Sequence, residues 1–414
     1  MKDQFYVDIL NEKLLNIYEG EINFYHPDDN NSTTGNITLE LSPHPEILMT
    51  SNNPVTLKSQ KERFPQEYDI RTINEYIMEE RGSENSYNPE QEDTIKSFTI
   101  YLNSVKTKDT EVDEVVFFIV NCDHIGLRNY EEAEYEFEHE DWLIKFNFRP
   151  DKKVKSHYES LKRSRGHEIT HVGSISKRDK QCFNTAEMEG IISNMEWYLS
   201  FCSAESVFIP IQIGLKNEKK VWEHYEIKRN KTGHYQNGLE WIPIGGVKYF
   251  NKFFSNVATK LKQELWEDVL PIVLNWYLEI KGDGMLENKI ISTQIALEQL
   301  AWTYLVNQEQ MLDKEGYKKL RAADILRLLC YQLNISREIQ HADLLEEEFL
   351  KKYQNDGVFM FVDFRNNLVH PDKKMSTHQL DRNTQAIVYL QGVYFLERAM
   401  TRIFGYEGKY RILL

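Results

Sequence analysis

The sequence predicts an α+β multidomain protein, with a β-rich N-terminal domain followed by an all-α helical bundle. Two observations predict this class. In the N-terminal half, short segments rich in Ile, Val, Phe and Tyr alternate apolar with polar residues, as strands do. From about residue 255 onward, apolar residues recur every three or four positions, which is the helical period. The chain has 414 residues, enough for two or three domains.

The composition is that of a folded, acidic chain. Hydrophobic residues make up 41% and aromatic residues 12%, which excludes a disordered, collagen-like or coiled-coil protein. The net charge of −15 argues against a dedicated duplex-binding protein, whose surface should be basic. Residues 1–282 hold 33 Lys and Arg against 47 Asp and Glu, whereas Asp283–Leu414 holds 17 against 18. The charge of the near-neutral C-terminal part therefore does not exclude a site for nucleic acid, while the acidic first part is better suited to binding a protein or to shielding such a site.

The cysteines and apolar runs indicate the compartment. Cys122, Cys182, Cys202 and Cys330 form no C-x-x-C pair, so neither a zinc knuckle nor a disulfide framework is expected. The longest apolar runs, such as VVFFIV (115–120), fall far short of the ~20 residues that span a bilayer, and the N-terminus lacks a signal-peptide core. We therefore expect a soluble, reduced, cytoplasmic protein with no membrane partner. The sequence holds no Gly-rich phosphate loop of the form G-x-x-x-x-G-K or G-x-G-x-x-G, and no cofactor is expected.

The expected strands of the first domain are separated by turn clusters. Gly, Pro, Asn, Asp and Ser gather at 26–35, 81–94 and 228–238. A helix is expected around Ala186–Phe201, followed by a strand at 206–215. The other expected strands cover 5–10, 22–26, 36–41, 98–102, 115–120 and 142–148.

The helical period divides the chain into three parts. A β-rich domain is expected over 1–254, a connecting helix over 255–282, and a helical domain over 283–414. The run Lys281-Gly282-Asp283-Gly284 is a helix stop, because glycine disfavours continued helix. The helices expected after it span 287–306, 315–333, 346–355, 357–369 and 378–406.

The helix expected over 357–369 carries an unusual arginine. Arg365 lies three or four positions from Phe361, Val362, Leu368 and Val369, in the middle of an apolar stripe. A charged side chain in such a stripe is costly unless it is paired or lies at an interface. Two interpretations stay open: Arg365 pairs with a carboxylate of its own domain, such as Glu298, or it projects into a cleft that holds a phosphate.

A histidine follows at the end of the same helix. His370 should lie at the frayed C-terminal end, because Pro371 disfavours helix in the residue before it. On an ideal helix it points ~140° away from Arg365, whereas Asn366 shares its face and could orient the imidazole ring. A histidine that moves protons and an arginine that stabilises negative charge suit phosphodiester transesterification.

These residues carry a family resemblance. The string FRNNLVHPDKK (364–374) resembles the Arg-x4-His motif of HEPN ribonucleases. Residues 169–215 resemble the end of the N-terminal domain of the ApeA group, which are prokaryotic anti-phage HEPN proteins. The resemblance implies that Arg365 and His370 are the catalytic pair and that Asn366 is their polar support. It also implies a homodimer in which the two helical domains form one composite cleft.

The resemblance further implies an activity. HEPN enzymes are metal-independent endoribonucleases that leave a 2′,3′-cyclic phosphate and a 5′-hydroxyl. The protein would be a toxic effector of anti-phage defence that cuts RNA, with tRNA as one candidate. Its N-terminal domain would sense a phage or host protein and regulate the nuclease. The alternative is a catalytically inactive HEPN dimerisation platform with an acidic N-terminal protein-binding module.

A formal H-E-x-x-H motif at His167–His171 competes with this interpretation. On a helix it would bind zinc, with Glu168 as base and Glu187 or Glu189 as a further ligand. The β-branched Ile169 and Thr170 favour a strand instead, on which the two histidines are ~13 Å apart and cannot share a zinc. We therefore expect two histidines on one face of a half-exposed strand, with a zinc hydrolase as the less favoured function.

Two groups of cations remain. A basic run interrupts the acidic half and is either a solvated face or a contact for RNA phosphates. A second group follows the motif and could border the cleft. The run consists of Lys152, Lys153, Lys155, Lys162, Arg163 and Arg165, and the second group of Lys373, Lys374 and His378.

Overall fold

The computed structural model describes most of the chain. The described residues are 9–10, 14–26, 29–51, 53–56, 69–72, 76–87, 94–123, 134–227, 241–243, 246–370 and 382–412.

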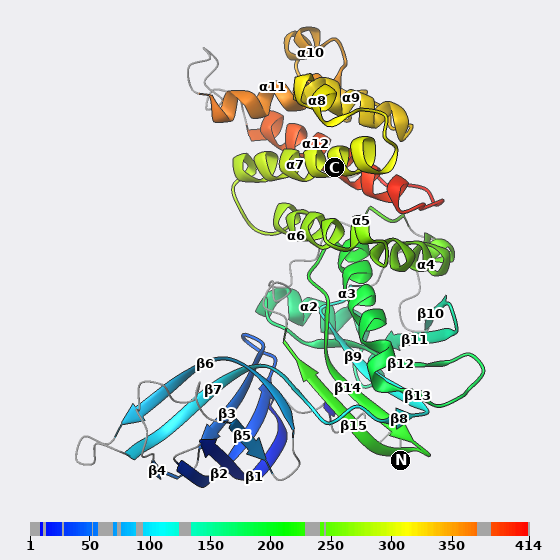
Figure 1. Cartoon of the computed structure of the whole chain (residues 1–414). Helices are drawn as coiled ribbons and strands as arrows, with labels where there is room; N and C mark the ends of the chain where they lie inside the picture. Colours follow the sequence, from blue (N-terminus) through cyan, green and yellow to red (C-terminus); the bar gives the residue numbers. More distant parts are fainter. Residues whose placement is uncertain are drawn as a thin grey trace.

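The protein is a mixed α and β structure with its strands in the N-terminal half and its helices towards the C-terminus (Figure 1), which confirms the predicted α+β class. In the described part of the chain, thirteen strands form one antiparallel sheet, in the order β10-β11-β12-β9-β14-β15-β7-β3-β2-β1-β5, with β4 and β6 attached to β7. Among the described residues, no helix is both long and apolar enough to cross a membrane.

The N-terminal lobe is a curled sheet with the strand order β6-β7-β3-β2-β1-β5. One edge of β7 pairs with β6, and the other pairs with β3 and, further along, with β15 of the central part. This long strand therefore joins the lobe to the rest of the sheet. The strands of the lobe are β1 (Leu14–His26), β2 (Asp29–Glu40), β3 (Glu46–Ser51), β4 (Val55–Thr56), β5 (Asp69–Thr72), β6 (Ile77–Tyr87) and β7 (Thr94–Lys106).

The central part holds the other strands and the first two α-helices described. Its middle strand, β9, is buried on both faces: Val115, Phe117 and Ile119 face the helices, while Val116 and Phe118 face the core of the N-terminal lobe. The elements are β8 (Glu111–Val112), β9 (Glu114–Val120), β10 (Glu134–His139), β11 (Trp142–Phe148), α2 (Val154–Ser164), β12 (Ile169–Lys177), β13 (Phe183–Asn184), η2 (Thr185–Met188), α3 (Glu189–Ser203), β14 (Phe208–Lys216) and β15 (Lys219–Glu226).

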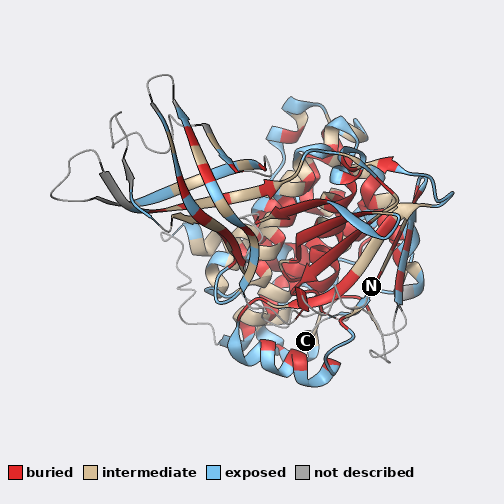
Figure 2. Ribbon diagram, turned by 90° about the horizontal axis from the view of Figure 1, so that it is seen from below, coloured by how far each residue is buried: buried red, intermediate tan, exposed pale blue. Residues whose placement is uncertain are grey.

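This double burial explains why β9 is apolar at every position from Val115 to Val120 rather than alternating. The packing beside it is close. A Cβ on Gly173 of β12 would lie 2.4 Å from the ring of Phe117 and 2.5 Å from the backbone oxygen of Lys145, so only glycine fits there. Figure 2 shows these central strands and the helices behind them as the most buried region of the molecule.

The helical part continues the same core, since α3 and the following helices share one buried cluster with the inner face of the sheet. Within this part, α11 packs against α7, α9 and α12. Its elements are η4 (Gly246–Tyr249), α4 (Phe250–Leu261), α5 (Glu264–Glu267), α6 (Val269–Lys281), α7 (Leu286–Ala301), the π-helix η5 (Trp302–Gln308), α8 (Lys314–Lys319), α9 (Ala322–Gln332), η6 (Ala342–Leu344), α10 (Glu347–Tyr353), α11 (Gly357–Val369) and α12 (Arg382–Ile403).

Several expected helices are divided. Residues 255–282 hold not one connecting helix but the end of α4 followed by α5 and α6, because the backbone turns extended at Gln263. The helix expected at 315–333 is likewise two, α8 and α9, separated by extended backbone at Leu320 and Arg321. By contrast, α11 covers residues 357–369 as the sequence predicts.

Two turn predictions and one strand prediction in the N-terminal half need correction. The polar segment expected to be a turn at 81–94 belongs to β6 as far as Tyr87, because its backbone pairs with β7. In the same way, β2 begins at Asp29, inside the turn cluster expected at 26–35. In the strand expected at 5–10, residues 9–10 are helical and the others lie outside the described residues, as does the turn cluster 228–238.

Candidate functional site

Helix α11 is fixed at its N-terminal end and packed tightly against α12. The Asp356 carboxylate caps the helix by accepting a hydrogen bond from the Phe359 amide, at 3.0 Å. Gly392 of α12 allows the ring of Phe361 to approach, since a Cβ there would lie 2.3 Å from that ring. The helix carrying the candidate residues therefore has a defined place in the bundle.

Arg365 is half-buried on α11 and contacts its neighbour in sequence. Its Nη1 donates a hydrogen bond to Oδ1 of Asn366, at 3.3 Å. Its Nε is buried, and within the described residues it has no hydrogen-bond acceptor. Glu298, one of the expected partners, instead accepts a hydrogen bond from Gln294 at 2.6 Å. A buried guanidinium nitrogen without an acceptor is costly, and an anion could satisfy it.

His370 lies where the sequence predicts, at the C-terminal end of α11. Its backbone is extended (φ −120°, ψ 90°), and its amide donates to the Asn366 carbonyl at 3.0 Å. Its side chain is exposed to solvent. The Asn366 side chain was expected to orient the imidazole of His370. Instead, that side chain accepts a hydrogen bond from Arg365, and the Asn366 backbone carbonyl accepts one from the His370 amide.

A row of polar groups continues along α11 from this site. Asp363 accepts hydrogen bonds from Lys352 at 2.8 Å, from the Tyr353 hydroxyl at 3.0 Å and from the Asn367 amide at 3.5 Å. The charge of Asp363 is therefore compensated by Lys352, and this carboxylate is not available to Arg365. The remaining cations expected near the site, Lys373, Lys374 and His378, lie outside the described residues.

A cavity of about 480 Å³ at the other end of α11 was not expected from the sequence. It is lined by Arg327, Arg337 and Lys352, together with Asp356 and Phe359. These residues come from α9, α10, α11 and the segments between them, so no single stretch of sequence predicts the cavity. A local feature is the ion pair of Asp324 with Arg327, three residues apart on α9.

Most of the positive charge in this cavity is already paired. Arg327 binds Asp356 at 2.8 Å and Asp324 at 2.9 Å, and Lys352 binds Asp363. Of the three cations, only Arg337 is exposed there without an ion pair to a described residue. Glu338 also lines the cavity, so its described residues offer an anion little uncompensated positive charge.

Of the H-E-x-x-H residues, Ile169, Thr170 and His171 belong to β12, as the sequence predicts, whereas His167 and Glu168 lie just before the strand. The strand is not half-exposed at these positions: His167 and His171 are both buried, because the strands and loops around them close over both rings. Nδ1 of His167 lies 3.1 Å from the Pro43 carbonyl, and Nδ1 of His171 lies 3.1 Å from the Thr170 hydroxyl.

The other expected zinc ligands are engaged elsewhere. Glu187 binds Lys177 at 3.3 Å, and Glu189 binds Lys106 at 2.8 Å. Within the described ranges, no group of three His, Cys, Asp or Glu residues is placed to hold a metal ion. The geometry around the motif therefore does not assemble the site that a zinc hydrolase would need.

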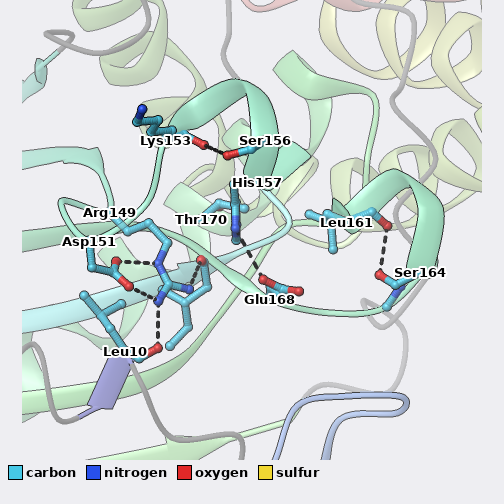
Figure 3. Close-up of polar contacts among 12 residues, drawn as sticks. Leu10, Arg149, Asp151, Lys153, Ser156, His157, Leu161, Ser164, Glu168 and Thr170 are labelled. Carbon is cyan, nitrogen blue, oxygen red and sulfur yellow. Dashed lines mark hydrogen bonds and ion pairs between the residues drawn. The ribbon is translucent and has the colours of Figure 1, made fainter. Parts of the chain in front are cut away.

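Glu168 contacts His157 of helix α2 instead (Figure 3). Its carboxylate lies 3.3 Å from Nδ1 of His157. Burial, together with the nearby Arg149 and Lys152, lowers the pKa of His157 to about 4. Next to this pair, Arg149 binds Asp151 through two hydrogen bonds of 2.7 Å and donates to the Leu10 carbonyl, so it ties the N-terminal segment to the central part.

The basic run is exposed, with Lys155, Lys162 and Arg163 on α2 and the other three cations just before or after it. This helix buries one apolar side and turns its cations to solvent, as its amphipathic pattern requires. Arg165, at its end, approaches Asp283 in the connection between α6 and α7, at 3.6 Å. The exposed helix face is thus confirmed, and contact with RNA remains a prediction. The buried residues of α2 are Val154, His157, Tyr158 and Leu161.

Comparison with known proteins places the chain in a family. Residues 107–236 match the YopA central domain, and residues 263–414 match the YopA C-terminal domain. The chain is also 32% identical over 310 residues to the SPbeta prophage-derived uncharacterized protein YopA of Bacillus subtilis (strain 168), a match that covers 73% of this chain and 69% of that protein. No solved structure matches. With this identity and coverage, the chain belongs to the YopA family.

Proposed function

We propose that the helical part is a HEPN-like, metal-independent endoribonuclease and that Arg365 and His370 carry out the reaction. The observation that carries the proposal is the guanidinium of Arg365, whose buried Nε has no acceptor among the described residues. Five residues later, His370 exposes its imidazole at the end of the same helix. An RNA phosphate would give Arg365 an anion that no described residue supplies, and it would bring the reacting bond close to a group that can transfer protons.

The reaction is an internal transesterification. The 2′-oxygen forms a bond to phosphorus while the bond from phosphorus to the 5′-oxygen breaks, giving a 2′,3′-cyclic phosphate and a 5′-hydroxyl. One imidazole accepts the proton of the 2′-hydroxyl, and a second donates a proton to the leaving 5′-oxygen. Arg365 stabilises the charge that develops on the phosphoryl oxygens. No step requires a cofactor.

Two imidazoles at one phosphate require two copies of the chain. In a homodimer with a two-fold axis, the α11 helices would bring together two copies of Arg365 and His370 in one cleft. An exposed apolar side chain supports this arrangement, since Val369, directly before His370, is 42% exposed. We expect a mass of twice 49.2 kDa by light scattering, and we expect Val369→Lys to give a monomer that has lost the activity.

We further propose that the nuclease acts in the cytoplasm in anti-phage defence and that the acidic N-terminal half responds to a phage or host protein. The family relative carries the words "prophage-derived" in its name, which is compatible with a role in competition between phages. The acidic N-terminal half favours a protein trigger over RNA in that part of the molecule. Transfer RNA is one candidate substrate.

The test uses the full chain with total cellular RNA in the presence of EDTA. We expect wild type to cut RNA, leaving ends that polynucleotide kinase labels without prior phosphatase treatment, as a 5′-hydroxyl requires. His370→Ala should lower the rate by about 10²–10⁴, and Arg365→Ala by about 10²–10³.

Two variants elsewhere in the helical part serve as matched controls and should cut normally. Arg402→Ala changes an exposed arginine of α12. His341→Asn changes a histidine whose φ is 57°, a conformation that asparagine tolerates well.

Equal cutting by wild type and His370→Ala would overturn the proposal. If neither protein cuts RNA while both form the dimer, the alternative of an inactive HEPN-like dimerisation platform with an acidic protein-binding module is favoured. Loss of cutting in EDTA alone would contradict the metal-independent mechanism.

A further inference from the structure

A cavity of about 610 Å³ opens in the N-terminal lobe, far in sequence from Arg365 and His370. It is lined by both edge strands of the lobe, β5 and β6, and by the inner side of β3 and β7. The two edges of the curled sheet therefore meet around this cavity. Its size lies within the range of small-molecule sites, about 300–1,000 Å³.

The floor of the cavity is apolar. Met49, Ile100 and Leu102 form it and are at most 3% exposed. Ile70 and Met78 are half-buried on the walls. A ligand with an apolar body would remove the remaining apolar surface of these side chains from water, which favours binding.

Three of the described residues that line the cavity are charged, and two of the three are cations. Arg71 of β5 and Lys108, just after β7, are exposed there, with Glu80 of β6 as the one carboxylate among the described lining residues. The guanidinium of Arg71 also lies over the ring of Tyr25, 5.2 Å from its centre, which limits where the side chain can point. Two cations from different parts of the sheet at one opening favour an anionic group over a cationic one.

We propose that this cavity binds a small amphipathic anion, whose apolar body lies on Met49, Ile100 and Leu102 and whose anionic group meets Arg71 and Lys108. The apolar floor sets the affinity, and the two cations set the preference for an anion. The proposal does not depend on the ribonuclease activity, because none of these residues belongs to the helical part.

The cavity also touches the junction with the central part. Tyr76 lines it, and the Tyr76 hydroxyl donates a hydrogen bond to the buried Glu223 of β15. A ligand that displaces Tyr76 would therefore act on a contact between the lobe and the central sheet.

The test is a titration of the full chain, labelled at its methionine methyl groups, with decanoate. The protein has ten methionines, of which Met49 and Met78 line the cavity, so the others serve as internal controls. We expect the methyl signals of Met49 and Met78, assigned by Met→Leu variants, to shift on binding. Decyltrimethylammonium has the same chain with a cationic head, and we expect it to bind at least about tenfold more weakly, a difference of about 1.4 kcal/mol.

A charge-reversal variant in the cavity, a matched charge-reversal variant outside it and a variant with a larger side chain in the cavity locate the site. Arg71→Glu combined with Lys108→Glu should abolish or reverse the preference for decanoate, whereas Lys219→Glu combined with Lys318→Glu, on exposed lysines outside the cavity, should keep it. Met78→Trp should fill the cavity and remove binding of both probes. Shifts that avoid Met49 and Met78, equal binding of the two probes, or an unchanged preference in the Arg71 and Lys108 variant would each overturn the proposal.

Discussion

Two junctions in the described part of the molecule are each built around one buried carboxylate. Glu223 of β15 lies between the N-terminal lobe and the central part, and Glu397 of α12 lies between α6 and the rest of the helical part. Each carboxylate accepts hydrogen bonds from two tyrosine hydroxyls and one lysine. The partners are Tyr76, Tyr225 and Lys220 for Glu223, and Tyr277, Tyr410 and Lys281 for Glu397.

The same chemistry has different consequences at the two places. Lys281 is 5% exposed and Glu397 is fully buried, so their 3.3 Å ion pair lies away from water. Lys220 is 46% exposed and reaches Glu223 from its own strand. The junction at Glu397 is therefore a desolvated cluster, whereas the Glu223 carboxylate is tied to the lobe through the hydroxyl of Tyr76. We expect the free energy of unfolding to depend far more on the Glu397 junction than on the Glu223 junction.

The largest effect should follow from removing one charge of the buried pair. Glu397→Gln leaves the Lys281 ammonium buried without this carboxylate, and breaking such a pair costs about 3–5 kcal/mol. We expect the free energy of unfolding, measured by urea denaturation followed by tryptophan fluorescence, to fall by that amount.

A double variant provides the control for this prediction. Glu397→Gln combined with Lys281→Met removes both charges, so much of the lost stability should return. If the double variant is no more stable than Glu397→Gln alone, the buried ion pair is not the reason for the effect, and the comparison of the two junctions fails.

Lowering the pH should reduce the stability of the region around α2. Burial lowers the pKa of His157 to about 4, so the unfolded chain binds this proton more readily than the folded chain. The stability contributed by the neutral imidazole is therefore present above about pH 6.5 and is lost as the pH falls towards 4. Allowing for partial solvent screening, we expect a loss of roughly 2 kcal/mol.

Hydrogen exchange can locate this acid effect. His157 lies close to Arg149, which holds the Leu10 carbonyl, so exchange should rise first around α2 and β12 rather than in the helical part. His157→Phe should remove this part of the pH dependence. An unchanged slope of stability against pH between about 6.5 and 4 in that variant would assign the acid sensitivity to other groups.

Local signals in the sequence predicted the helix with the candidate site well. The apolar period predicted residues 357–369, and the preference of the residue before a proline predicted the end of the helix and the place of His370. The cap at its other end, Asp356, is a finding of the structure. The divided helix at Leu320 and Arg321 was missed because neither glycine nor proline marks it. The strand β6 was missed because its polar residues are held by pairing with β7, which the sequence does not reveal.

The contacts of Arg365, the cavities and the buried carboxylates depend on tertiary packing, which the sequence does not reveal. The apolar stripe raised the question of what pairs with Arg365, and the structure shows that Glu298 accepts a hydrogen bond from Gln294, one turn before it on α7, instead. The cavity at Met49 is built from strands that lie apart along the chain, so no local pattern predicts it. The roles of Glu223 and Glu397 cannot be identified from the sequence either, because their tyrosine partners include residues more than about 100 positions away.

A smaller effect is expected at the junction of the lobe. Tyr76→Phe removes the hydrogen bond from the lobe to Glu223 but leaves the carboxylate with Tyr225 and Lys220. A hydrogen bond to a charged group contributes about 1.5–3 kcal/mol, and the remaining donors place the expected loss near the low end, about 1.5 kcal/mol. Urea denaturation measures it, with Tyr25→Phe on the exposed surface as the control. A loss as large as that of Glu397→Gln would show that the two junctions are equally strong.

The smallest effect is expected for the exposed lysine of the same junction. Lys220→Met removes an ion pair whose lysine is 46% exposed, and such pairs contribute about 0–1 kcal/mol because water and salt screen them. We expect a change of less than about 0.5 kcal/mol, which should shrink further in about 0.5 M NaCl. The matched variant Lys281→Met, which leaves Glu397 buried without its cation, should cost several times as much at both salt concentrations. If the two lysine variants are equally destabilised, burial does not distinguish the two carboxylates, and the difference between the junctions must come from their tyrosines.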